Sequence, residues 1–216
     1  MYMTVYWHKK ENNTKLLLLF NGWGFDSRIF SDIDLPGYDC VSVCDYSQID
    51  PLQFVFTQDY PEVKVLAWSY GVFIANMYAQ YLQPVQKAVA VNGTTTPIND
   101  EKGIPENIFK ATIHSFSEKS KNKFYLRIAG GATNFQEIKE KLPMRDIESQ
   151  LSELKALQLL STREQGKGLL WDAAIVSSND KIFPADNMLH AWGEKAIRKE
   201  GEHYTDFSAI IKEYIL

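Results

Sequence analysis

A serine stands where a strand-like run of this chain turns directly into a helix-like run. Residues 65–77 read VLAWSYGVFIANM: the run before Ser69 is apolar, a glycine follows two positions after it, and apolar residues then recur at helical spacing. A buried strand that leads straight into a helix is the repeating unit of a parallel α/β sheet. This stretch therefore predicts an α/β fold with a hydroxyl group at the carboxyl end of one strand.

Other apolar runs have the length and pattern of further strands. Residues 16–20, LLLLF, are apolar at every position, which is typical of a central strand covered on both faces. Further strand-like runs are DCVSVC at 39–44, KAVAVN at 87–92, WDAAIVSS at 171–178 and EKAIRKE at 194–200. Helical patterns at 70–82 and 205–216 alternate with strands, and this alternation predicts a mostly parallel sheet with helices on both faces.

Two parts of the chain depart from this alternation. Residues 2–8 and 14–20 are strand-like and flank the polar run KKENN, which predicts a β-hairpin. Residues 97–167, after the fifth predicted strand, are polar, lysine-rich and helical in period, apart from the strand-like run FYLRIA at 124–129. Such a segment is too long for a plain loop. We expect a single α/β domain over residues 1–216, with 97–167 inserted as a short helical cap over the ligand-binding carboxyl edge of the sheet.

Charge and hydropathy exclude several classes of function. The chain has 216 residues and a net charge of −4, so it forms one sizeable core and implies no strongly basic face for nucleic acid. No apolar run approaches the ~20 residues that span a bilayer. In the amino-terminal MYMTVYWHKK the charges follow the apolar part, the reverse of the order in a signal peptide. We therefore expect a cytoplasmic protein with no nucleic-acid or membrane partner.

The two cysteines, Cys40 and Cys44, lie four residues apart in the strand-like run 39–44. On a strand their Cα atoms are about 13 Å apart at ~3.3 Å per residue, whereas a disulfide needs Cα atoms within ~7 Å. No cluster of histidines and cysteines lies near them in the sequence. We expect two buried, reduced thiols and no metal site.

The pentapeptide AWSYG at 67–71 gives Ser69 the setting of a catalytic nucleophile. A sharp turn between strand and helix forces its central residue into a strained backbone conformation and pushes the side chain outward. The positions two before and two after it must be small, and here they are Ala67 and Gly71. The same turn directs the first helical N–H, that of Tyr70, to where an oxyanion would form. The alternative is a serine that only caps the helix.

The loop NGWGFD at 21–26 offers a second oxyanion donor. Gly22 and Gly24 allow the backbone to curl beneath the serine, so that Trp23 donates its N–H while its indole forms a pocket wall. The alternative is a glycine turn with a core tryptophan.

A serine nucleophile needs a base beside it, and His203 is the best placed of the four histidines. It lies in KEGEHYTDF, a loop late in the chain between the last predicted strand and the last predicted helix. By contrast, His8 belongs to the first predicted hairpin, His114 to the predicted cap and His190 to the helix-like run ADNMLHAW. The alternative for His203 is a histidine on a surface loop.

A carboxylate must orient that base by accepting its second N–H. Asp180, which follows a strand in AAIVSSNDKIFP, is the preferred candidate, and Asp186 is a second one near the start of the next helix. Asp172 lies inside the strand, and Asp206 is too close to His203 in sequence. The alternative for Asp180 is a simple turn aspartate.

With Ser69, Asp180 and His203 in that order, the chain resembles the α/β-hydrolase superfamily over nearly its whole length. More specifically, FNGWGFD, AWSYGV, VNGTTTPI and GEHYTDF resemble the BioG family of pimeloyl-[acyl-carrier-protein] methyl ester esterases and, more distantly, the BioH enzymes. The resemblance implies a serine esterase of biotin biosynthesis that cleaves the methyl ester of pimeloyl-acyl-carrier protein without a metal or cofactor. It also implies that Ser69 is the nucleophile, His203 the base and Asp180 its partner, with Trp23 and Tyr70 forming the oxyanion hole.

Acyl carrier proteins are acidic, so this resemblance favours a basic docking face. The predicted cap contains a set of basic residues, namely Lys110, Lys119, Lys121, Lys123, Arg127, Lys139, Lys141 and Arg145. Glu118, Glu137 and Glu140 are interleaved with them, and an ordinary solvated face is the alternative. Arg127 is the least surface-like of the set by its neighbours, and we expect it to be a structural cation or a contact to the linker of the acyl chain.

Two other functions are compatible with the same residues. A general short-chain carboxylesterase or thioesterase of this fold would use the same three side chains. A non-catalytic binding protein of the hydrolase fold is less favoured, because such proteins usually lack one of them.

Overall fold

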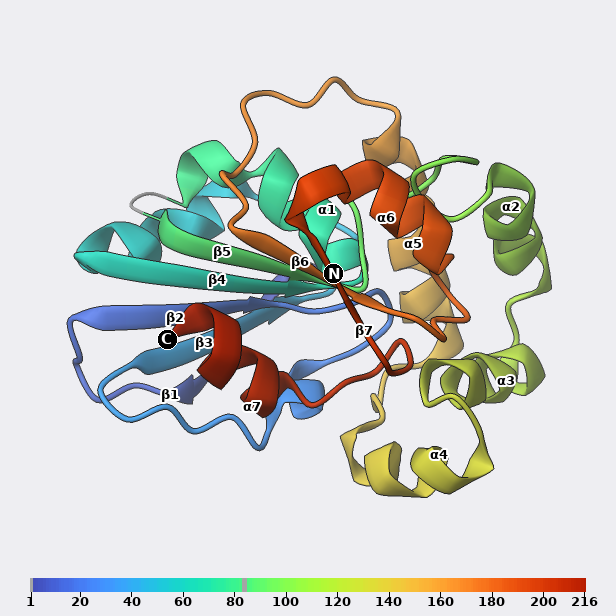
Figure 1. Cartoon of the computed structure of the whole chain (residues 1–216), viewed down its shortest axis with the longest axis horizontal. Helices are drawn as coiled ribbons and strands as arrows, with labels where there is room; N and C mark the ends of the chain where they lie inside the picture. The colour runs from blue at the N-terminus through green and yellow to red at the C-terminus, as the bar shows by residue number, and fades with distance from the viewer. Residues whose placement is uncertain (1, 83–84) are drawn as a thin grey trace.

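A seven-stranded sheet crosses the part of the chain that the computed structural model describes, residues 2–82 and 85–216 (Figure 1). The strands, in spatial order, are β1 (Thr4–Lys9), β3 (Asp39–Cys44), β2 (Lys15–Phe20), β4 (Glu62–Trp68), β5 (Val85–Val91), β6 (Ala173–Ser177) and β7 (Ala196–Lys199). Neighbours from β3 to β7 are parallel, and β1 pairs antiparallel with β3. The mostly parallel sheet predicted from the sequence is confirmed.

Helices lie on both faces of this sheet and at its carboxyl edge (Figure 1). The α-helices are α1 (Tyr70–Met77), α2 (Glu106–Ser115), α3 (Glu118–Ile128), α4 (Ala132–Ile138), α5 (Ile147–Ser161), α6 (Ala185–Trp192) and α7 (Phe207–Ile210). Short 3₁₀ helices are η1 (Ser27–Phe30), η2 (Pro51–Asp59), η3 (Ala79–Tyr81), η4 (Lys139–Lys141) and η5 (Gly193–Lys195), and η6 (Ile211–Ile215) is a π-helix. Across the described ranges, none of the helices has the length and hydropathy that a bilayer crossing requires.

Strand β2 shows why an unbroken apolar run becomes a central strand. Leu16, Leu18 and Phe20 point to one face and join a core that contains residues of α1 and α6. Leu17 and Leu19 point to the other face and join a second core, which contains residues of α7 and η6. All five side chains are fully buried, and each contributes about 1.5–3 kcal/mol on burial.

The predicted hairpin between β1 and β2 is wrong, because β3 lies between them. The polar turn is instead anchored to β3: the backbone N–H groups of Glu11 and Asn13 donate to Asp39 Oδ1 at 2.8 and 3.2 Å. A strand buried on both faces needs a neighbour on each side, and β2 takes β3 and β4. The half-exposed β1 remains at the edge of the sheet.

The segment between β5 and β6 contains α2, α3, α4 and α5, and Figure 1 shows these helices at the end toward which the parallel strands point. The strand-like interpretation of 124–129 is wrong, since α3 runs through it. Ser117 caps this helix by accepting the N–H of Ser120, and the buried Tyr125 and Ile128 are three residues apart on one helical face.

Both cysteines of β3 are free and buried. Burial raises the pKa of the Cys40 thiol to about 11 and that of the Cys44 thiol to about 12. Because the thiolate is the reactive form, we expect neither cysteine to react with Ellman's reagent at pH 8 within an hour in the native protein. Both should react within minutes in guanidinium chloride. Fast labelling of either thiol before denaturation would show that β3 is more open than described.

Candidate active site

Ser69 occupies the junction between β4 and α1 in a strained backbone conformation. Its φ is 58° and its ψ is −127°, a positive-φ region that costs a non-glycine residue about 1–3 kcal/mol. Its N–H donates to the Val91 carbonyl at the end of β5 at 2.9 Å. The serine caps no N–H of α1 with its side chain. The hydroxyl is therefore available for other contacts.

Glycines make room for this turn. A Cβ atom on Gly71 would lie 2.5 Å from the Phe20 carbonyl oxygen and 2.6 Å from that of Asn21. A Cβ on Gly93 would lie 2.1 Å from the Ser69 carbonyl oxygen. The sequence predicts that Gly71 must be small because it lies close to Ala67. In the structure, the atoms nearest to a Cβ on Gly71 are instead the carbonyl oxygens of Phe20 and Asn21, at and just after the end of β2.

His203 joins Ser69 to Asp180. Its Nε2 lies 3.0 Å from Ser69 Oγ, and its Nδ1 lies 2.7 Å from Asp180 Oδ2. A carboxylate only accepts hydrogen bonds, so Nδ1 carries the proton and Nε2 is free to accept the serine hydroxyl. The other Asp180 oxygen accepts the N–H groups of Ile182 and Phe183 at 2.7 and 2.9 Å, which fixes the carboxylate. The structure thus brings the three predicted side chains together from three separate segments.

The position of the imidazole is fixed by its surroundings. The ring stacks on Phe183 with centroids 6.1 Å apart and planes at 3°. The His203 carbonyl accepts the Trp68 indole N–H and an N–H of the Asn92 side chain, each at 2.9 Å. His203 is 1% exposed, so these contacts hold it away from bulk water.

Asn92 contacts the loop that carries His203, and the sequence analysis did not single it out. It follows β5 with a φ of 48°, and its amide nitrogen also donates to Ser177 Oγ at 2.9 Å and to the Glu202 carbonyl at 3.0 Å. Its amide oxygen accepts the Ser177 N–H at 2.8 Å. The sequence signal that could have identified Asn92 is a polar residue directly after a buried strand.

The backbone N–H groups of Trp23 and Tyr70 have no hydrogen-bond partner within residues 2–82 and 85–216. Tyr70 opens α1, where the first N–H groups have no acceptor within the helix. A Cβ on Gly22 would lie 3.0 Å from the Cβ of Ser69, so the loop before Trp23 touches the serine. These are the two donors that the sequence predicted for an oxyanion.

A narrow cleft of about 60 Å³ opens above Ser69. Its wall is mostly apolar and comes from α2, α3 and α5 as well as the sheet, with Ile108, Phe109, Phe124, Ile128, Leu154 and Ile182. Two cations, Arg127 and Lys181, also line it. Arg127 is exposed, so the prediction from its neighbours that it is the least surface-like basic residue is wrong.

Tyr70 adds a buried hydroxyl to the cleft-lining residues. Its Oη has no hydrogen-bond partner among the described residues, and burial raises its pKa well above the usual value. The phenol therefore stays protonated and neutral at any physiological pH.

The other candidate residues lie elsewhere. His8 contacts Ser42 Oγ, and His114 and His190 contact backbone carbonyls of Lys110 and Glu101. Among the other acids, Asp172 accepts the Ala88 N–H, Asp206 caps α7, and Asp186 lies in the first turn of α6. No group of three or more histidine, cysteine or acidic side chains in the described ranges forms a metal-ligand cluster.

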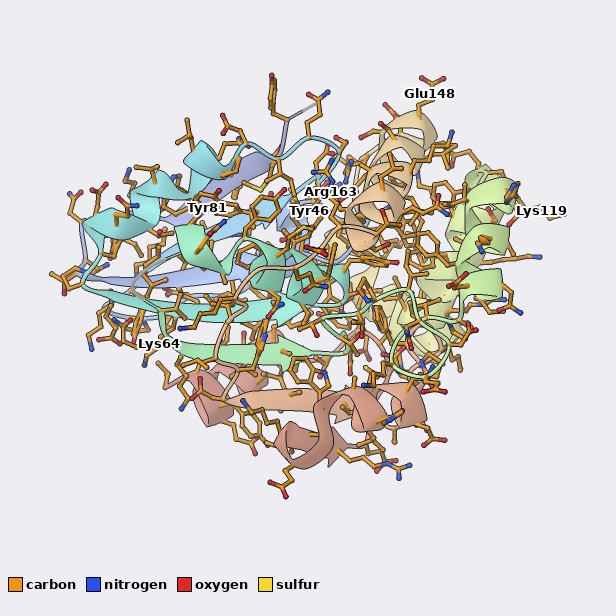
Figure 2. The ribbon with its side chains drawn as sticks, turned by 90° about the horizontal axis from the view of Figure 1, so that it is seen from above. Tyr46, Lys64, Tyr81, Lys119, Glu148 and Arg163 are labelled. Atoms are coloured by element: carbon orange, nitrogen blue, oxygen red, sulfur yellow. The ribbon has the colours of Figure 1, made fainter. Side chains whose placement is uncertain are left out.

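The basic residues of the insertion divide into two groups. Lys119 is exposed and extends away from the body of the protein in Figure 2, and Lys110, Lys123, Arg127 and Lys139 are exposed too. Three others are held by internal contacts. Lys121 donates to the Arg145 carbonyl, Lys141 pairs with Asp32 and Arg145 pairs with Glu153. The predicted basic set is therefore only partly available to a partner.

A model of the family described as "Pimeloyl-ACP methyl esterase BioG" matches residues 3–212. The chain belongs to the BioG family. A crystal structure of BioG from Haemophilus influenzae superposes with a TM-score of 0.82 and 31% identity over 95% of this chain and 94% of that one. The esterase RhEst1 from Rhodococcus sp. ECU1013 shares the α/β-hydrolase fold, with a TM-score of 0.65 and 17% identity over 98% of this chain and 92% of that one.

Two sequence relatives differ in how much of their length this BioG chain covers. It is 33% identical over 201 residues to the malonyl-[acyl-carrier protein] O-methyltransferase of Bacteroides fragilis (strain 638R). That match spans 91% of this chain but only 40% of the relative. It is also 35% identical over 193 residues to an uncharacterized protein of Haemophilus influenzae (strain ATCC 51907), covering 88% of each.

Crowding at the Ser69 turn predicts a marked effect of Gly71→Ala. The added methyl would meet backbone oxygens that cannot rotate away, so we expect a loss of about 1–3 kcal/mol and a fall in Tm of roughly 3–10 °C. Gly166→Ala is the matched control, because its Cβ meets nothing within 4 Å. Thermal unfolding followed by circular dichroism measures both. Equal Tm values for the two variants would contradict the described packing.

Proposed function

We propose that this protein is a serine esterase that hydrolyses the methyl ester of pimeloyl-acyl-carrier protein in biotin synthesis. The observation that carries the proposal is the continuous contact from Asp180 through His203 to Ser69, next to two unpaired N–H groups, in a member of the BioG family. These groups supply a nucleophile, a base and an oxyanion hole, which acyl transfer requires.

The first half-reaction forms an acyl-enzyme. His203 Nε2 takes the hydroxyl proton as Ser69 Oγ attacks the ester carbonyl carbon. The negative charge on the carbonyl oxygen is stabilised by the N–H groups of Trp23 and Tyr70. The tetrahedral intermediate then breaks its C–OCH₃ bond, and His203 gives its proton to the departing methoxide, which leaves as methanol.

The second half-reaction restores the enzyme. His203 removes a proton from water, whose oxygen attacks the acyl carbon, and the oxyanion forms again against the same two N–H groups. Ser69 Oγ leaves and is reprotonated by His203, so that the pimeloyl group is released as a carboxylic acid, which loses its proton to solvent. Throughout, Asp180 holds the imidazole in one tautomer and stabilises its protonated form.

The narrow apolar cleft supports selectivity for the far end of the acyl chain. A thioester is no less vulnerable to a serine nucleophile than a methyl ester, so the bond to the carrier must be kept away from Ser69. An apolar cleft of about 60 Å³ admits methylene groups and excludes a folded carrier protein. The exposed Arg127 at the cleft is suited to an acidic carrier outside it.

Two competing functions need direct tests. A general carboxylesterase or thioesterase would hydrolyse carrier-free esters, or the carrier thioester, as fast as the carrier-bound methyl ester. Methyl transfer is the other candidate, because one relative is named a methyltransferase. The chain covers only 40% of that relative. A methyl ester on an acyl-carrier-protein substrate is also the group whose bond the proposed esterase would hydrolyse.

Removing the proposed nucleophile tests the proposal. In a strain without a pimeloyl methyl esterase, we expect the wild-type gene to permit growth on medium without biotin and Ser69→Ala to prevent it. With purified protein, the release of methanol from the carrier-bound ester should fall by roughly 10⁴–10⁶-fold in the variant.

Matched substrates separate the alternatives in the same assay. Free methyl esters should react more slowly than the carrier-bound ester, and the carrier thioester should remain intact. Rapid release of the carrier, or methylation of the free acid in the presence of S-adenosylmethionine, would overturn the proposal.

Asp180→Asn tests the proposed role of the carboxylate. The amide oxygen still accepts the Ile182 and Phe183 N–H groups, but its NH₂ group favours the wrong imidazole tautomer. We expect kcat to fall about 10⁴-fold with Tm nearly unchanged. A loss of less than tenfold in steady-state hydrolysis would mean that this carboxylate does not orient the base.

A further inference from the structure

Helix α5 holds the loop that carries one of the proposed oxyanion donors. We propose that Glu153, assisted by Gln150, is a positioning residue that fixes the Trp23 N–H for transition-state binding. This inference rests on the proposed function, and it assigns a positioning role to the buried ion pair of Glu153 and Arg145.

Three hydrogen bonds join one turn of α5 to two consecutive loop residues. Glu153 Oε2 accepts the Gly24 N–H at 3.0 Å. Gln150 Nε2 donates to the Gly24 carbonyl at 2.8 Å, and the Gln150 carbonyl accepts the Trp23 indole N–H at 2.8 Å. Glu153 and Gln150 are three positions apart, so both side chains leave the same face of the helix.

The peptide groups on both sides of Trp23 are fixed, one by α5 and one by a bond within the loop. The peptide after it is held through the Gly24 N–H by Glu153. The peptide before it is held through the Gly22 carbonyl, which accepts the Phe25 N–H at 3.3 Å. The indole is anchored as well, so little freedom remains in the direction of the Trp23 N–H. A displacement of one ångström at such a donor is enough to weaken catalysis strongly.

The carboxylate that holds the loop is fully buried and charge-compensated. Glu153 and Gln150 are 0% and 1% exposed. Arg145 Nη1 contacts Glu153 Oε2 at 2.5 Å, and Arg145 Nη2 pairs with Asp45 at 3.1 Å. The second Glu153 oxygen accepts the Tyr46 N–H at 3.0 Å, after the end of β3.

A buried ion pair is a poor way to gain stability alone, because apolar residues of similar size often replace it without loss. A carboxylate, however, is a stronger acceptor for a backbone N–H than a neutral group. The charge of Glu153 is therefore better explained by the precision that it gives to the loop than by stability.

The test compares variants that break the same cluster on different sides. Glu153→Gln keeps the shape and removes the charge, and Gln150→Met removes the donor to Gly24 while leaving the ion pair intact. Asp45→Asn is the matched control, since Asp45 pairs with Arg145 and accepts from Ser47, and within residues 2–82 and 85–216 no hydrogen bond or ion pair joins it to Trp23, Gly24 or Ser69. The substrate is a 4-nitrophenyl ester, and a boronic acid serves as the probe that forms a tetrahedral adduct with the serine.

We expect kcat to fall about 10–100-fold in Glu153→Gln and Gln150→Met with KM changed less than threefold. The Kd of the boronic acid should rise by the same factor, while the fraction of titratable serine stays that of the wild type. In Asp45→Asn, both kcat and the boronic acid Kd should stay within twofold of wild type.

Opposite outcomes are distinguishable. If kcat falls only in proportion to the titratable serine, with an unchanged boronic acid Kd, the cluster is merely structural and the inference is wrong. If kcat and the boronic acid Kd of Glu153→Gln and Gln150→Met match those of Asp45→Asn while the wild type is active, the inference fails and the esterase proposal survives. A wild type that hydrolyses no ester and binds no boronic acid would overturn both.

Discussion

The forced backbone of Ser69 is the constraint on which the rest of the site depends. A positive φ is unfavourable for serine, and it persists because the ends of neighbouring strands surround the turn. Val91 accepts the serine N–H, the end of β2 lies against Gly71, and Gly93 lies against the serine carbonyl. The imidazole of His203 approaches the hydroxyl of Ser69. Packing of the strand ends around the turn thus holds Ser69 in its strained conformation. This conformation fixes the position of the Ser69 hydroxyl.

The parts of the site that local sequence determines could be predicted. A strand–serine–helix junction needs small residues near the serine, and Gly71 indicated that Ser69 lies at such a junction. The carboxyl ends of parallel strands meet at one edge, so loop residues after later strands, such as Asp180 and His203, could be expected near the serine. The choice among several acids and histidines depended on their place after a strand or in a loop. Those signals are carried by short stretches of sequence.

What could not be predicted depends on contacts between distant segments. The polar run after β1 indicates that the chain reverses direction. It does not indicate that β3, and not β2, pairs with β1. In the sequence, Arg145 looks like one more surface cation in a lysine-rich segment, and only the fold shows that it meets Glu153 and Asp45 in the interior. Asn92 is a similar case, since its four side-chain hydrogen bonds reach three residues that lie 85–111 positions away.

The length of these connections has a consequence for how the protein is made. The Trp68 indole reaches the His203 carbonyl across 135 residues, and the Gly24 N–H reaches Glu153 across 129. A ribosome that has delivered the Ser69 turn has not yet delivered α5, which contacts the Trp23 loop, or His203, the proposed base. In the nascent chain, Ser69 therefore lacks its imidazole partner until residue 203 has emerged, and such non-local contacts favour slow folding. The chemistry proposed for Ser69 is thus coupled to synthesis of the chain as far as His203.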